Sequence, residues 1–161
     1  MKRKSALGLA LAGALSSFFV ARPGSAGVIV NIAEPFEQLV SIPCADGGSG
    51  EDVLLTGFLH ILVTETLDAK GRPHLTAHFQ PMGVAGTGLT TGDVYRATGI
   101  TRETDNGFAF AVPFEVTFVN NFRIIGPGTG NNLLIHQVFH MTVDANGFVT
   151  AFVDLLSAEC K

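Results

Sequence analysis

The sequence predicts an all-β protein: a single antiparallel up-and-down β-barrel of seven or eight strands, closed by a disulfide. Apolar residues alternate with a period of two, and Gly and Pro recur too often for long helices. The motifs DAKG, DNG and DANG indicate hairpin turns. Cys44 follows the first expected strand and Cys160 ends the last, as neighbouring first and last strands would allow. A β-sandwich is the alternative, because it could also place these two strands together.

The first 26 residues predict a secretory signal peptide, and residues 27–161 the β-barrel domain. A basic segment at 2–4 precedes an apolar run at 6–21, and the small residues at 24–26 offer a cleavage site. A transmembrane anchor is the rival interpretation, but the run is shorter than the roughly 20 residues that a bilayer needs. We therefore expect an exported protein, secreted or periplasmic, with no membrane span after cleavage.

Charge and composition limit the possible partners. The chain has 161 residues and a formal net charge of -4. Removing the first 26 residues leaves 135, with six basic and fourteen acidic side chains and hence a charge of -8. Such a chain lacks the basic patch of a nucleic-acid binder, so we expect no nucleic acid. Its hydrophobic fraction of 47% is too high for a disordered chain.

The expected strands follow one another with short connections. Turns at 68–71, 105–107 and 144–147 join neighbouring strands into hairpins, and the glycine-rich segments 81–92 and 126–132 are expected to be loops around a barrel mouth. Pro113 predicts a bend, and 120–125 either continues the strand before it or begins another. The expected strands are 36–43, 53–67, 74–80, 93–101, 108–118, 120–125, 133–143 and 148–160.

Alternation divides these strands into a consistently apolar face and a mixed face. One unbroken apolar row is expected to line the core: Phe108, Phe110, Val112, Phe114, Val116 and Phe118. The mixed face carries all five histidines but is still half apolar. This surplus of apolar side chains indicates a self-association surface, such as a homodimer interface, or a second, partly enclosed layer.

Cys44 and Cys160 are expected to form a disulfide. Export would place them in an oxidising compartment, where paired cysteines are normally bonded. Free or metal-binding thiols are the alternative, but the two residues lack the CxxC spacing of a zinc site.

The histidines permit two interpretations, a functional cluster or structural and surface residues. Partners four residues apart on a strand lie about 13 Å apart, so neither of the two such pairs can chelate one ion. We therefore expect no metal. If the 68–71 turn pairs Leu67 with Pro73, however, His60 and His78 become diagonal neighbours on one face.

Two further residues are candidates for ligand binding. Arg123 stands in a polar stretch of an apolar strand, so it either pairs with a carboxylate in the core or points at a ligand. Tyr95 follows a glycine-rich loop. No serine of the expected mature chain stands in GxSxG, and the glycine-rich segments match neither GxGxxG nor the Walker pattern. We therefore assign no catalytic residue and no cofactor, and take Arg123, Tyr95, His60 and His78 as candidate ligand-binding residues.

Four segments, 43–60, 86–99, 119–132 and 151–160, are similar to those of a group of short, secreted bacterial β-rich proteins of uncharacterised function. The resemblance covers most of the expected mature chain. It implies export, and no activity, cofactor or binding residue follows from it.

Three functions follow as hypotheses. The first is a non-enzymatic binding module that holds a small, largely apolar molecule in a barrel. The second is an enzyme of the cyclase or isomerase kind, in which an apolar cavity does most of the work and one or two of Tyr95, Arg123 and His60 assist. The third is a structural or interaction protein that associates through its mixed face.

Overall fold

The computed structural model describes residues 26–107 and 111–161. The expected signal peptide, apart from its last residue, lies outside these ranges, and so do Phe108 and Phe110 of the expected apolar row. Among the helical residues of the described ranges, none form a segment long and apolar enough to cross a bilayer.

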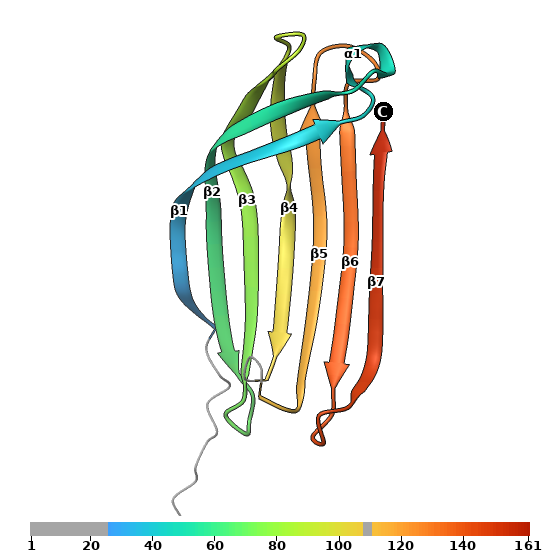
Figure 1. Cartoon of the computed structure of the whole chain (residues 1–161). Helices are drawn as coiled ribbons and strands as arrows, with labels where there is room; N and C mark the ends of the chain where they lie inside the picture. The colour runs from blue at the N-terminus through green and yellow to red at the C-terminus, as the bar shows by residue number, and fades with distance from the viewer. Residues whose placement is uncertain (1–25, 108–110) are drawn as a thin grey trace, which may run out of the picture.

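The described residues form one antiparallel sheet of seven strands in sequence order (Figure 1). A short helical turn, α1 (Ala45–Gly48), connects the first two strands. The all-β, antiparallel prediction is therefore confirmed. β1 and β7 occupy the two edges of the sheet. The strands are β1 (Gly27–Ile42), β2 (Glu51–Leu67), β3 (Pro73–Gly88), β4 (Val94–Asn106), β5 (Phe114–Ile125), β6 (Leu133–Val143) and β7 (Val149–Cys160).

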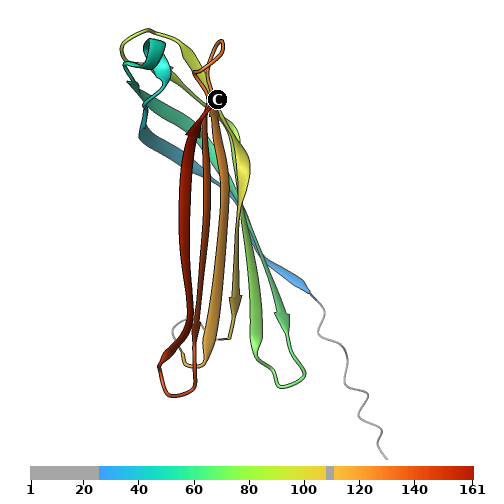
Figure 2. The ribbon, with the colours of Figure 1, turned by 90° about the vertical axis from the view of Figure 1, so that its right-hand side faces the viewer.

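A disulfide holds the two edge strands together at one end. Cys44 and Cys160, separated by 116 residues in sequence, have Cα atoms 5.9 Å apart and are bonded. The upper parts of β1 and β2 bend across the sheet toward the end of β7, where α1 and the C-terminus lie (Figures 1 and 2). The predicted disulfide is thus confirmed, and it links the ends of the two edge strands where the sheet curls.

Several strands are longer than the sequence predicted. β1 begins at Gly27, and β4 continues to Asn106. The expected loop at 81–92 was wrong in its first part, because β3 continues to Gly88 opposite β2. A glycine is needed within this stretch, since a Cβ on Gly86 would collide with the carbonyl oxygen of Leu54. Glycine here marks a close approach of two strands and not a loop.

β5 is shorter than expected at its start. The prediction began this strand at Phe108, but β5 begins at Phe114, directly after Pro113. Proline has no N–H to donate to a ladder, so the strand starts after it, and Val112 lies in a bend outside the sheet. The strand then runs without a break to Ile125. Of the two expectations for 120–125, the one that this segment continues the preceding strand is therefore confirmed.

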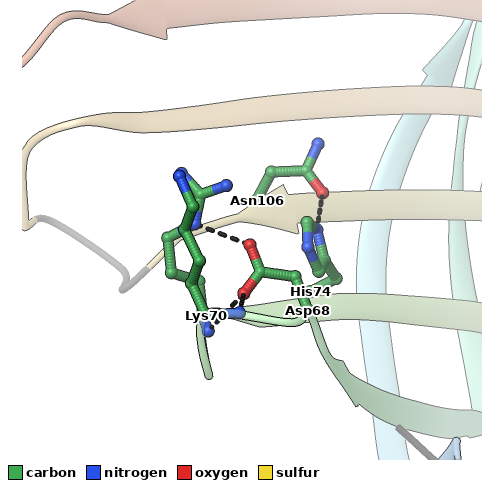
Figure 3. A network of polar contacts seen from close by, with 5 residues as sticks. Asp68, Lys70, His74 and Asn106 are labelled. Atoms are coloured by element: carbon green, nitrogen blue, oxygen red, sulfur yellow. Dashed lines mark hydrogen bonds and ion pairs between the residues drawn. The ribbon is translucent and has the colours of Figure 1, made fainter. Parts of the chain in front are cut away.

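Two aspartate turns set the register of their hairpins. In the first, the N–H of Gly71 donates to the carbonyl of Asp68 at 2.9 Å, and Gly71 has the positive φ expected for it, 77°. The Asp68 carboxylate accepts hydrogen bonds from the N–H groups of Lys70 and Arg72 (Figure 3). These bonds, led by those from Arg72, lower the pKa of Asp68 to about 2. Asp144 accepts the equivalent backbone bonds in the β6–β7 turn.

The buried core lies at the disulfide end of the sheet. Its members come from six strands and α1, and they share the face of the sheet toward which the strands curl, here called the concave face. The core residues are Ile42, Ala45, Val53, Leu55, Val84, Tyr95, Ile124 and Leu133. The opposite side is called the convex face. Beyond the core, most concave side chains of β2 to β6 are half-buried, and this is where space remains.

Candidate functional site

The concave face holds a cavity of about 360 Å³. Its lining comes from six of the seven strands, so it exists only because the sheet curls around it. The lining residues are Phe36, Gln38, Val40, Leu59, Phe79, Thr101, Glu103, Phe118, Asn120, Phe122 and Ile135. This is the size and apolar character of a small-molecule site.

Phenylalanines give the cavity its apolar wall. Phe36, Phe79, Phe118 and Phe122 lie on β1, β3 and β5, and each ring is half-buried. Phe118 and Phe122 share the concave face because alternate residues of β5 point the same way, and buried Ile124 continues the row. Phe114, Val116 and Phe118 of the expected apolar row therefore lie on the concave face, which is the face that contains the core, as predicted.

Four polar side chains interrupt the apolar wall. Thr101 and Asn120 face each other across β4 and β5, and the Thr101 hydroxyl donates to Asn120 Oδ1 at 2.9 Å. Glu103 lies two residues further along β4, opposite Phe118, and Gln38 comes from β1. Burial raises the pKa of Glu103, and the negative charge of Asp105 raises it further. The cavity thus pairs an aromatic wall with one carboxyl and two amide groups.

A buried polar cluster closes the disulfide end of the concave face. Glu51 is only 5% exposed, and it accepts hydrogen bonds from the Tyr95 hydroxyl at 2.7 Å and the Thr91 hydroxyl at 2.9 Å. The bond from Tyr95 is the main reason that the pKa of Glu51 is lowered. Burial, together with this carboxylate, raises the pKa of Tyr95. Every polar atom is partnered, so this cluster ties β2, β4 and the loop between β3 and β4 together.

The structure does not bring the four predicted ligand-binding residues together. Tyr95 is fully buried on the concave face and is bonded to Glu51. Arg123 is exposed and pairs with Thr98, which lies three residues from Tyr95 on β4 and therefore on the convex face. Arg123 neither pairs with a core carboxylate nor points into the cavity.

The histidines all lie on the convex face. The predicted register is confirmed: Leu67 pairs with Pro73, which makes His60 and His78 diagonal neighbours. Three histidines are bonded to asparagine side chains: His60 to Asn31 at 2.8 Å, His74 to Asn106 at 2.7 Å (Figure 3) and His136 to Asn121 at 2.7 Å. Within residues 26–107 and 111–161, no group of three or more His, Cys, Asp or Glu side chains is placed to hold a metal ion. These contacts favour a structural role for these three histidines, which link neighbouring strands.

Sequence reasoning missed Glu103 and Asn120 as cavity residues. Glu103 was overlooked because the fourth strand was expected to end at Thr101, which left Glu103 between that strand and the 105–107 turn. Extending the alternation of Ala97, Gly99 and Thr101 by one step would have placed its carboxyl on the concave face. In the polar stretch of β5, the inward residue is Asn120 and not Arg123.

Comparison of the chain with protein-family models, curated proteins and solved structures found no match. The function is therefore argued from the geometry of the site.

Proposed function

We propose that this protein is a secreted, non-enzymatic β-module that binds a small, largely apolar ligand in the concave cavity. The observation that carries the proposal is the cavity itself, about 360 Å³ lined by four half-buried phenylalanines and few polar groups. A ligand there would remove apolar surface from water on both partners, at roughly 25 cal/mol for each Å². Thr101 and Asn120, already bonded to each other, offer a fixed polar point for orientation.

The proposal includes closure of the sheet into a barrel by pairing of β1 with β7. Each of these strands has one unpaired edge, and the disulfide already holds them together at one end. Every residue of β7 is exposed, and it carries large apolar side chains such as Phe152 and Leu156. An edge of this kind is normally covered or paired.

Hydrogen exchange tests this closure. In a closed barrel, nearly all amides of β7 between Val149 and Cys160 are protected, whereas in an open sheet alternate amides exchange rapidly. Rapid exchange at alternate β7 positions, at all protein concentrations, would contradict closure. Protection that grows with protein concentration would indicate pairing with a second copy instead.

Calorimetric titration with 1-octanol tests ligand binding. Thr101→Phe fills the cavity and is expected to abolish binding, whereas Thr98→Phe makes the same change on the convex face of the same strand and is expected to leave binding intact. The thermal unfolding of both variants shows whether each is folded. If neither 1-octanol nor a charged probe with the same tail bound the unaltered protein, or if both folded variants bound octanol equally, the proposal would be refuted.

An enzyme of the cyclase or isomerase kind is the second candidate, and one observation favours it. Glu103 presents a carboxyl with a raised pKa to an apolar cavity, beside the amide of Asn120. A carboxyl in such surroundings is the kind of group that serves as a general acid or base. Tyr95, Arg123 and His60 add nothing to this candidate, because they do not meet in the cavity. Recovery of an added apolar ligand unchanged after prolonged incubation would favour the binding module.

A further inference from the structure

We infer that the ligand of the concave cavity is an organic cation, an ammonium group attached to an apolar body. This inference rests on the proposed binding function and narrows its ligand class. It follows from three properties of the cavity: it contains a carboxyl group, it has no basic side chain in its lining, and phenylalanine rings surround the carboxyl.

Glu103 is the charged group of the cavity lining. No Lys, Arg or His is among the eleven described lining residues, and within the described part of the chain the side chain of Glu103 makes no hydrogen bond or ion pair. A carboxylate in apolar surroundings without a partner is costly, and a positive ligand group would remove that cost. The raised pKa of Glu103 expresses the same cost in the absence of a ligand.

The rings around this carboxyl suit the same ligand. Phe118 pairs directly with Glu103 across β4 and β5, and Phe79 pairs with Thr101 in the next row. The negative face of an aromatic ring attracts an ammonium group, most strongly where water is excluded. A carboxylate among phenylalanines therefore favours a cation over a neutral alcohol, and it disfavours a carboxylate ligand by repulsion.

The basic side chains of the strands all lie on the convex face of the sheet, which leaves the concave face negatively charged. At the concave positions of the described strands, the register places six carboxyl groups and no basic side chain: Glu34, Glu51, Glu65, Glu103, Asp105 and Asp154. The convex positions hold Arg96, Arg102, Arg123 and all five histidines, together with four carboxyl groups, those of Glu37, Asp52, Glu115 and Glu159. The concave side thus attracts cations to the opening of the cavity.

Three probes with the same tail decide between ligand charges: n-octylammonium, 1-octanol and octanoate. They are titrated into the protein at mildly alkaline pH, which favours the ionised form of Glu103. We expect octylammonium to bind roughly tenfold more tightly than octanol, the effect of one charge-assisted hydrogen bond, and octanoate to bind weakest. Octylammonium binding no tighter than octanol, or octanoate binding tightest, would overturn the inference.

Variants test whether Glu103 is the source of this preference. Glu103→Gln is expected to lower octylammonium affinity about tenfold, to that of octanol, while octanol affinity stays unchanged. Glu37→Gln removes the same charge from the convex face and should preserve the preference. A Glu103→Gln protein that keeps the preference would also overturn the inference, and if this variant does not fold, Glu103→Ala replaces it. Failure of all three probes to bind the unaltered protein would instead refute the proposed binding function.

Discussion

The Tyr95 hydroxyl donates a hydrogen bond of 2.7 Å to the carboxylate of Glu51, and this pair joins β4 to β2 at the disulfide end of the sheet. Two glycines make room for it. A Cβ on Gly88 would collide with the Glu51 carboxylate, and one on Gly126 with the Tyr95 ring. Both glycines belong to segments that read as glycine-rich loops in the sequence. Their role is therefore to leave room for the buried pair of Glu51 and Tyr95.

Replacing Tyr95 by Phe is expected to destabilise the protein most at neutral pH. The folded-state pKa of Glu51 lies below its ordinary value of 4.5, so the carboxylate contributes stability above pH 4.5 that is lost as the pH falls through the lowered pKa. Tyr95→Phe removes the main cause of that shift. Denaturant unfolding at several pH values should show a loss that narrows below pH 4.5.

A double-mutant cycle provides the control for this pair. If the bond between Tyr95 and Glu51 accounts for the effect, Tyr95→Phe should cost much less in a Glu51→Gln background than in the unaltered protein. Equal costs in the two backgrounds would show that the hydroxyl stabilises the fold by another route.

Gly126→Ala is expected to destabilise the fold by about 1–3 kcal/mol, the usual range for overpacking. The added methyl would meet both the buried ring of Tyr95 and the backbone of Asn131, neither of which can move freely. Gly128→Ala, in the same loop, meets nothing within 4 Å but has a φ of +78°, so backbone strain alone should cost about 1 kcal/mol. Thermal unfolding that ranks Gly128→Ala as the more damaging change would contradict this account of Gly126.

The sequence predicted the strands best where local chemistry decides the structure. The Asp68 turn fixes its hairpin through bonds within five residues, and the β2–β3 register followed from it correctly. β6 begins and ends where expected, at Leu133 and Val143. Alternation likewise placed the histidines on one face, and the Cys44–Cys160 bond followed from strand order.

The cavity was less predictable because it depends on contacts between distant strands. Phe36 and Phe118 line the same cavity only because the sheet curls. The local sequence pattern predicts the strands but not the curvature of the sheet. The glycines misled the prediction, since Gly86 reads as a loop residue but allows close approach of β3 to β2. Arg123 was chosen as a candidate because it is a charged residue in an apolar strand. The alternation of side chains along β5, however, places it on the convex face.

Removing the disulfide is expected to cost about 4–5 kcal/mol, because a loop of more than a hundred residues gains entropy in the unfolded chain. The bond closes 116 residues of sequence. Chemical denaturation of the unaltered protein and of the Cys44→Ser/Cys160→Ser protein measures the difference. A loss well below this range would mean that the unfolded chain keeps its ends close without the bond.

Glu103→Gln is expected to stabilise the ligand-free protein at neutral pH while weakening cation binding. Burial raises the folded-state pKa of Glu103 above its ordinary value of 4.5, with Asp105 contributing. On β3 and β5 the side chains that face Glu103 are the uncharged Ala77 and Phe118. A carboxyl with a raised folded pKa contributes stability that is complete below pH 4.5 and is lost as the pH rises through the raised value.

Glutamine does not titrate, so Glu103→Gln should avoid that loss. Its advantage over the unaltered protein is expected to be absent below pH 4.5 and to grow as the pH rises, which unfolding measured at four or five pH values would reveal. The matched change Glu37→Gln, on the exposed convex side of β1, should show no such growth. A residue that weakens the fold where it stands but improves binding is typical of a functional site. Stability of Glu103→Gln that falls below that of the unaltered protein at neutral pH would instead make Glu103 a structural residue.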